Sequence, residues 1–214
     1  LMSIIFNNID NMSFSDINDE SEFIPLMTSE DEEALEKESL PEVLPILPLT
    51  NTVLFPGVVI PINAGRDMSI KLIKDANKSN KLIGVIAQKN IKIENPNIEN
   101  IYSIGTVAKI LRVLKMPDGN TTVIIQGKKR FKIKSVVKTD PYIQATIDPV
   151  SDKNQKKPDS KFTATIDAIK DIALKIIKEN PNIPSEASFA IKNIHSSSFL
   201  INFVCSNMNI SVKD

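Results

Sequence analysis

The sequence predicts an α+β fold, in which a small and mostly antiparallel β-barrel with one inserted helix is followed by a C-terminal helical bundle. Residues 41–150 predict the barrel, because short aliphatic and β-branched runs alternate there with turn residues. Residues 160–214 predict the bundle, because their apolar residues recur at helical spacing. A polar linker at residues 151–159 separates the two parts.

The barrel opens with the densest apolar run of the chain, residues 44–62. Its four prolines lack the N–H group that a central strand donates, so the run cannot be a single strand or a helix. It predicts two strands, at residues 44–49 and 58–63, and a connecting loop that carries Leu54, Phe55 and Pro56. Strands this apolar are expected to be buried on both faces or to line a groove.

The inserted helix is expected to start at Asp67, because Gly65 and Arg66 end the preceding strand and an apolar face follows at helical spacing. Further strands are expected at residues 82–88, 104–116, 121–126, 130–134 and 142–147. The Pro-Asp-Gly-Asn sequence at residues 117–120 predicts a hairpin turn.

Three helices are expected after the linker. The first has an apolar stripe made by Phe162, Ile166, Ile169, Ala173 and Ile176. Pro181 ends this helix, Pro184 opens the second, and the serines at 196–198 can cap the third. None of these helices can bury its stripe alone, so they are expected to pack together, on the barrel or against a partner.

Charge is distributed unevenly along the chain, although the formal net charge is zero. Residues 1–39 hold eleven acids and one lysine, which leaves fifteen acids and twenty-five bases in the remainder. A segment with so much like charge and few core residues is typical of a disordered tail, which we assign to residues 1–40. The alternative is an acidic arm that masks the basic domain.

Catalytic constellations are absent from the sequence, which predicts that this part of the protein is not an enzyme. One histidine, His195, and one cysteine, Cys205, cannot assemble a zinc cluster. No phosphate-binding loop and no Gly-x-Ser-x-Gly elbow is present, so no cofactor or metal is expected. No apolar run reaches the ~18 residues of a membrane span and no signal peptide is recognisable, so a cytoplasmic protein is expected.

Apolar residues in predicted loops form the first candidate binding surface. Because loops are normally polar, such residues either join the core or form a peptide-binding patch. The residues concerned are Leu54, Phe55, Pro56, Met116 and Pro117, together with Val58 at the start of the following strand. Soft Met and Phe side chains would let a patch of this kind accept many sequences.

A basic strand forms the second candidate surface. Its bases are Lys128, Lys129, Arg130 and Lys132. A basic barrel face can bind nucleic acid through phosphate charge and base stacking, but aromatic residues are scarce. A solvated outer strand face is therefore favoured over nucleic-acid binding.

Several separated motifs follow one another along the chain. They are Leu47-Pro48-Leu49, Phe55-Pro56-Gly57, Pro61-Ile62, Gly65-Arg66, Ile104-Gly105-Thr106-Val107-Ala108, residues 114–119 and residues 126–131. In this order and spacing they resemble the amino-terminal domain of the Lon ATP-dependent proteases. The resemblance covers residues 43–150 well and 160–213 more loosely, and it leaves out the acidic residues 1–39.

The resemblance implies a non-catalytic substrate-recognition domain. Such a domain binds exposed hydrophobic segments of unfolded or damaged proteins and delivers them to the AAA+ motor of an ATP-dependent serine protease. It also implies ATP and Mg²⁺ in the full-length parent, and a homohexamer as the assembly. A free-standing peptide-binding adaptor of the same fold is the alternative.

Overall fold

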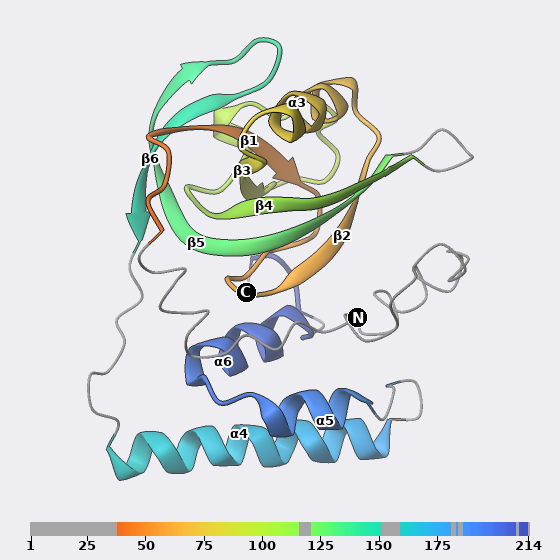
Figure 1. Ribbon diagram of the computed structural model, residues 1–214, viewed down its shortest axis with the longest axis vertical. Coiled ribbons are helices and arrows are strands. Elements are labelled where there is room, and N and C mark those ends of the chain that lie inside the picture. Colours follow the sequence, from red (N-terminus) through yellow and green to blue (C-terminus); the bar gives the residue numbers. More distant parts are fainter. Residues whose placement is uncertain are drawn as a thin grey trace. The chain divides into compact units, whose positions relative to one another are not determined.

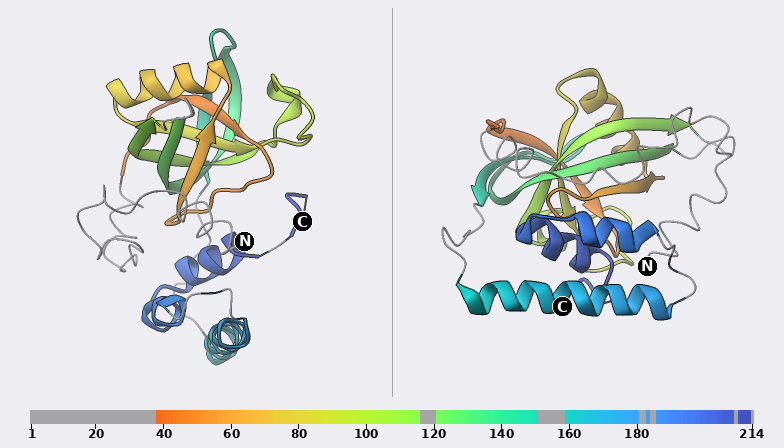
Figure 2. Two further views of the ribbon diagram at one scale, coloured as in Figure 1. Left: turned by 90° about the vertical axis from the view of Figure 1, so that its right-hand side faces the viewer. Right: turned by 60° about the horizontal axis from the view of Figure 1, so that its bottom comes forward.

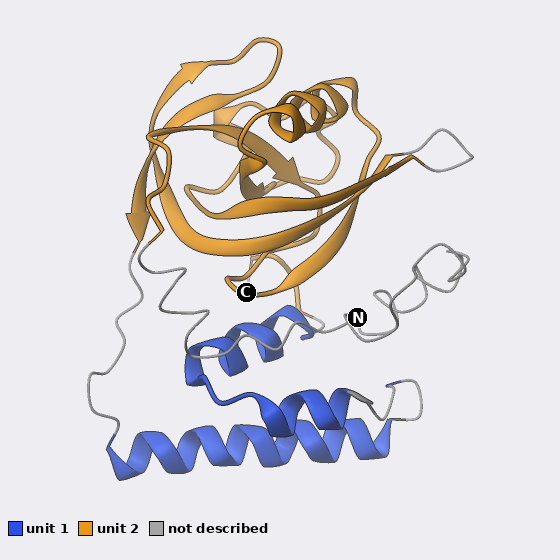
Figure 3. Ribbon diagram, in the orientation of Figure 1, with its two compact units in different colours: residues 1–33, 152–209 blue, residues 34–151, 210–214 orange. Residues whose placement is uncertain are grey.

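The computed structural model describes residues 38–115, 121–150, 159–180, 183, 186–208 and 210–213. The predicted tail up to residue 37, the hairpin tip at 116–120 and the linker residues 151–158 lie outside this part. The chain divides into two compact units (Figure 3). The sheet unit comprises residues 34–151 and 210–214, and the helical unit comprises residues 1–33 and 152–209.

Six strands form one sheet in the described part of the sheet unit. They are β1 (Val43–Leu49), β2 (Val59–Ala64), β3 (Leu82–Ala87), β4 (Ile104–Lys115), β5 (Thr121–Lys138) and β6 (Gln144–Val150). Their order is β2-β5-β4-β3-β1-β6, and β5 also pairs with β6, so that the pairing returns to β5 (Figure 1). β1 and β3 pair in parallel, and the remaining pairs are antiparallel. Together with the helices, this sheet confirms the predicted α+β class.

Strand β5 is longer than the sequence predicts. Two separate strands were expected, at residues 121–126 and 130–134, but the structure has one continuous strand of 18 residues. Opposite it, Thr106 pairs with Arg130 and Ala108 pairs with Gly127, so two residues of β5 face one residue of β4. This β-bulge takes up the extra residue without ending the strand. The Gly-Lys-Lys sequence is therefore a bulge and not a break.

The two prolines inside β1 occupy positions where no hydrogen bond is lost. The Ile46 N–H points towards β6, where it donates to the Ile143 carbonyl. Alternate residues of a strand point their N–H groups to the same side, so the nitrogen of Pro48 also faces the β6 side. β1 pairs with β6 only at Val43–Pro45, so no partner strand lies opposite the Pro48 nitrogen. The nitrogen of Pro45 lies on the β3 side, before the parallel register starts at Ile46. This placement explains how a strand with two prolines lies between two neighbours.

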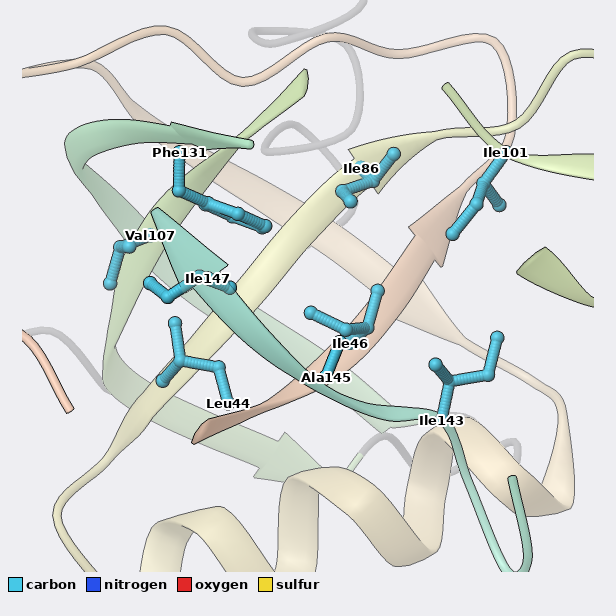
Figure 4. Packing of buried hydrophobic residues seen from close by; sticks show 9 residues of the cluster. All are labelled: Leu44, Ile46, Ile86, Ile101, Val107, Phe131, Ile143, Ala145 and Ile147. Carbon is cyan, nitrogen blue, oxygen red and sulfur yellow. The ribbon is translucent and has the colours of Figure 1, made fainter. Parts of the chain in front are cut away.

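Phe131 of β5 belongs to a cluster of buried hydrophobic side chains inside the sheet unit (Figure 4). Its members are Leu44, Ile46, Ile86, Ile101, Val107, Phe131, Ile143, Ala145 and Ile147. A Cβ atom on Gly84 or Gly105 would lie 2.8 or 3.0 Å from Cζ of the Phe131 ring. The two glycines therefore make room for this fully buried ring.

Helix α3 (Asp67–Lys78) packs against β1 and β3 and buries Leu72 and Ile73 (Figure 1). The adjacent residues Ile46 and Leu47 of β1 point to opposite faces of the sheet, and both are buried. The burial on both faces that the apolar sequence of β1 predicts is therefore present. A 3₁₀ turn, η2 (Ile98–Asn100), lies in the predicted loop between β3 and β4.

The helical unit contains α4 (Ser160–Glu179), α5 (Glu186–Asn193) and α6 (Ser197–Ser206). The side chain of Asp159 caps α4 by accepting a hydrogen bond from the Phe162 N–H at 2.7 Å. The predicted serine cap of α6 is Ser196, whose Oγ accepts from the Phe199 N–H at 3.0 Å. α4 and α5 lie side by side (Figure 2), and Lys170 Nζ donates to the carbonyl that follows α5.

One residue of the predicted α4 stripe is misplaced. Ile176 was expected to be buried, but 55% of it is exposed, and the neighbouring Ile177 is buried instead. Ile177 follows Ile166, the other buried residue of α4, by three helical turns and so lies on the same side. The buried stripe of α4 is therefore narrower than the apolar sequence pattern suggests.

Lys81, between α3 and β3, has a left-handed backbone conformation with φ of 60°. A side chain costs roughly 1 kcal/mol there, whereas glycine adopts this conformation freely. The Lys81→Gly substitution should therefore raise the free energy of unfolding by about 0.5 kcal/mol, measured by urea denaturation. Lys78→Gly, in the last turn of α3, should lower it by up to about 1 kcal/mol. Destabilisation by both substitutions would contradict the strain at Lys81.

Candidate functional site

The apolar loop before β2 is partly buried. Leu54 is 4% exposed and Val58 is 6% exposed, so these two residues belong to the core. Phe55 and Pro56 are half-buried and keep part of their surface accessible. Met116 and Pro117, the other two predicted patch residues, lie outside the described residues. The described apolar surface of this loop therefore centres on Phe55 and Pro56.

Hydrogen bonds hold the loop firmly against β4 and β5. The buried hydroxyl of Thr106 in β4 donates to the Leu54 carbonyl at 2.7 Å. Gly127 of β5 accepts from the Gly57 N–H and donates to the Val58 carbonyl, both at 2.9 Å. Gly57 has φ of 79°, which a glycine adopts without strain. The position of Phe55 is therefore set by the backbone on either side of it.

Gly127 permits the close approach of this loop. A Cβ atom at position 127 would lie 2.2 Å from the Phe55 carbonyl oxygen and 2.9 Å from its carbon. Both are backbone atoms, which cannot rotate away as a side chain can. A glycine is required at this position for the loop to lie where it does.

An open hollow of about 210 Å³ lies beside the loop. It is lined by Val53, Leu54, Phe55, Val85, Ala87, Tyr102, Ile104, Gly105, Thr106, Arg130 and Val212. The hollow brings Leu54 and Phe55 of the predicted patch together with Arg130 of the predicted basic strand. Val53 is 41% exposed and Ile104 is 54% exposed, so the hollow also has accessible aliphatic groups.

Sequence reasoning missed Val53, Tyr102 and Ile104 as site residues. Ile104 was assigned to the start of a strand, where an apolar residue is normally core. Its position as the first residue of a long strand, directly before a glycine, is the one signal that could have marked it as exposed. Val53 and Tyr102 lie in connections and carry no comparable signal.

The chemistry of the hollow suits an apolar group better than a reaction. Most of its lining is aliphatic or aromatic, and Arg130 supplies a guanidinium group. No group of three metal-ligating side chains is found in the part of the chain that the structure describes. His195 is exposed in the connection between α5 and α6, and Cys205 is half-buried. No described helix is both long and apolar enough to cross a membrane.

Two basic residues of β5 contact the chain just before β1. Lys128 Nζ lies 2.9 Å from a carboxylate oxygen of Glu38, and Lys129 Nζ donates to the Glu38 backbone carbonyl at 3.0 Å. The Lys128 side chain is 12% exposed. Lys132 is exposed, and its neighbour Arg130 is half-buried. The lysines of the β-bulge are thus engaged within the chain.

Tyr142, in the connection between β5 and β6, is tied to α3. Its hydroxyl donates to a carboxylate oxygen of Asp75 at 3.1 Å. Burial, with this hydrogen bond and the negative charge of Asp75, raises the pKa of the Tyr142 phenol above its ordinary value of 10.0. This contact joins the helix to the far end of β5.

Comparison with known proteins gives consistent matches. Residues 43–214 match the model of the substrate-binding domain of the ATP-dependent protease La (LON). A Lon protease of Flavobacterium johnsoniae is 63% identical over 206 residues, which are 96% of this chain and 25% of that protein. A Lon protease of Cytophaga hutchinsonii is 49% identical over 193 residues, which are 90% of this chain and 24% of that protein. The chain thus spans about a quarter of the length of these relatives.

A solved structure has the same fold. The N-terminal domain of the Mycobacterium avium complex Lon protease superposes with a TM-score of 0.62 and 20% sequence identity. The match covers 78% of this chain and 84% of that structure. At this level of identity the match concerns the arrangement of helices and strands.

Gly127→Ala should displace the loop that carries Phe55. The added methyl group clashes with backbone, so we expect the free energy of unfolding to fall by about 1–3 kcal/mol. Amide hydrogen exchange at Gly57 should accelerate, because its hydrogen bond to residue 127 is broken. Gly65→Ala is the matched control, since nothing lies within 4 Å of its added Cβ. Unchanged exchange at Gly57 would show that the loop does not depend on Gly127.

Tyr142→Phe should have a pH-dependent effect on stability. Because the phenol pKa is raised in the folded protein, the stabilisation by the hydrogen bond is complete below the pKa of an unfolded tyrosine, about 10. It is lost as the pH rises through the raised folded pKa. Urea denaturation should therefore show the variant to be less stable than wild type at neutral pH, with the difference closing at strongly alkaline pH. A difference independent of pH would contradict this account.

Proposed function

The chain belongs to the Lon protease family, whose substrate-binding domain it carries, and from this we propose that it binds exposed hydrophobic segments of unfolded or damaged proteins. The hollow beside Phe55 is the observation that supports this proposal most directly. It combines a preformed apolar lining with accessible aliphatic groups at Val53 and Ile104. An extended apolar segment could place one side chain there without a large rearrangement of the domain.

Modest affinity is expected from this site. Burying an aliphatic side chain contributes about 1.5–3 kcal/mol, and a single open hollow takes one such group. Much of that gain is offset by the ordering of an unfolded segment. A site of this kind discriminates weakly between sequences, which suits the recognition of many different unfolded chains.

The parent protein is proposed to supply the catalytic machinery. The curated relatives are proteases about four times as long as the matched region, so the ATPase motor with its ATP and Mg²⁺, and the serine peptidase, are assigned to regions outside this sequence. The part described here would act without catalysis and hand its substrates to that motor. A cytoplasmic homohexamer would present several copies of the hollow, and such multivalency raises the overall affinity.

We interpret the closed circuit of strand pairing as the small barrel that the sequence predicts, and the three helices after it as the helical bundle. A closed arrangement has a functional advantage, because β4 and β5 are each paired with a neighbouring strand on both edges, which holds them in place. The loop with Phe55 is bonded to these two strands. The binding surface would then be held in a constant shape while substrates change.

Binding of a permanently unfolded, fluorescently labelled protein tests the proposal. Ile104→Ser should weaken this binding about five-fold, because roughly 1 kcal/mol of apolar burial is removed. Val137→Ser is the matched control, because Val137 on β5 is 55% exposed, as Ile104 is 54% exposed, and does not line the hollow. Neither substitution should unfold the domain, since both side chains are largely in solvent.

The salt dependence of the same binding separates the alternatives. Apolar recognition should persist at high salt, whereas binding through the basic strand should fall steeply, as it does for nucleic acid. Equal loss of binding in the Ile104 and Val137 variants would exclude the hollow as the site. Binding that disappears at high salt would favour Lys128, Lys129, Arg130 and Lys132 instead.

A further inference from the structure

We propose that Tyr102 is a specificity-determining residue of the hollow beside Phe55, and that its hydroxyl binds the main chain of a peptide whose apolar side chain enters the hollow. The inference rests on the proposed function and deepens it, because it names the group that distinguishes a peptide from another apolar ligand. It is argued from the polar groups of the lining and from the backbone that places Tyr102.

Three of the described lining residues carry a polar side chain: Tyr102, Thr106 and Arg130. The Thr106 hydroxyl already donates to the Leu54 carbonyl at 2.7 Å, and Arg130 also interacts within the chain. The Tyr102 side chain, in contrast, makes no hydrogen bond within the part of the chain that the structure describes. Among these three side chains, the Tyr102 hydroxyl is therefore the one whose hydrogen-bonding capacity is open to a ligand.

The Tyr102 hydroxyl is accessible, although the residue is half-buried. In the described part of the chain, no side-chain oxygen or nitrogen is both buried and without a hydrogen-bond partner. Since the Tyr102 hydroxyl lacks a partner there, it contacts solvent. Tyr102 also packs against the core cluster that contains Phe131. A tyrosine held in this way presents a polar tip at a low cost in conformational entropy.

The strand pairing beside the hollow is irregular. The regular pairing of β3 with β4 ends at Val85 and Thr106, and the two segments meet again at a bridge between Gln88 and Ile101. Between these points two residues of β3 lie opposite four residues of the facing chain, 102–105. Irregularities of this kind redirect side chains and are frequent next to functional sites.

Two backbone hydrogen bonds fix the irregular stretch. The Tyr102 N–H donates to the Ala87 carbonyl of β3 at 3.1 Å, and the Ser103 carbonyl accepts from the Ile133 N–H of β5 at 3.0 Å. Adjacent residues are thus bonded to different strands, which holds the backbone of Tyr102 in place before a ligand arrives. A hydroxyl that is positioned in advance loses little freedom on binding.

An apolar hollow with one available hydroxyl suits a peptide. Each residue of an extended peptide has polar main-chain groups beside its side chain, whereas a hydrocarbon chain of the same size has none. One hydrogen bond to the main chain should strengthen binding about five-fold. Because this bond involves no side chain of the ligand, it favours peptides over other apolar ligands without restricting their sequence.

The test measures the binding of a short peptide, with one leucine between glycines and serines, to the full chain by NMR at millimolar peptide concentration. Tyr102→Phe, which keeps the ring and removes the hydroxyl, should weaken binding at least three-fold. Tyr142→Phe is the matched control, because the hydroxyl of this other tyrosine bonds Asp75 and Tyr142 does not line the hollow. The control should leave peptide binding unchanged.

Two analogues of the peptide separate a direct hydrogen bond from a change in the shape of the hollow. In each, one of the two peptide bonds beside the leucine is replaced by a trans-alkene, which keeps the shape but has no polar group. For one analogue Tyr102→Phe should have no effect, since the group that the hydroxyl binds is already absent. An equal loss for the parent peptide and both analogues would overturn the inference. Equal binding of the parent peptide to wild type and to Tyr102→Phe would also overturn it.

The Ile104→Ser variant distinguishes failure of this inference from failure of the proposed function. If Ile104→Ser weakens peptide binding and Tyr102→Phe does not, the hollow is the binding site and only the role of Tyr102 is overturned. If wild type does not bind the peptide, or if Ile104→Ser leaves the binding unchanged, the proposed function fails and the inference fails with it.

Discussion

The continuous pairing of β5 is the constraint on which the sheet unit depends. Its first residues pair with β2, its first and middle residues with β4 and its last residues with β6. The buried Phe131 and the β-bulge at Lys128 and Lys129 lie on this one strand, and Gly127 beside them holds the apolar loop. A change in the register of β5 would therefore disturb the core, the loop and the basic surface together.

The candidate site illustrates how backbone contacts position a binding surface. The position of Phe55 is set by backbone hydrogen bonds of its neighbours. The Leu54 carbonyl accepts from the Thr106 hydroxyl, and the Gly57 N–H donates to the Gly127 carbonyl. Because these contacts involve the backbone of the loop, the loop can keep its position when the side chains that line the hollow are changed. Apolar and charged features meet at Arg130, because this residue lines the hollow and belongs to the basic surface of β5.

Local signals in the sequence predicted most helices and strands, but not which strands pair with one another. The prolines around β1, the strand end at Gly65 and the serine cap of α6 each act within a few residues, so their effects could be derived. The pairing of β5 with β6 depends on segments that no local pattern links. The burial of Leu54 and the exposure of Ile104 also follow from tertiary neighbours. The sequence predicts two strands separated at residues 127–129, whereas pairing with β4 makes them one strand with a β-bulge.

The pairing of β1 with β6 has a consequence for how the protein is made. Val43 lies opposite Thr146, so the first strand of the sheet meets one of its partners only after nearly all of the sheet unit has been synthesised. During translation β1 leaves the ribosome long before β6, and its edge on that side has no strand to pair with in the nascent chain. Closing so long a loop is slow compared with the formation of helices. The β6-side edge of β1 therefore has no partner until residues 144–150 have been made.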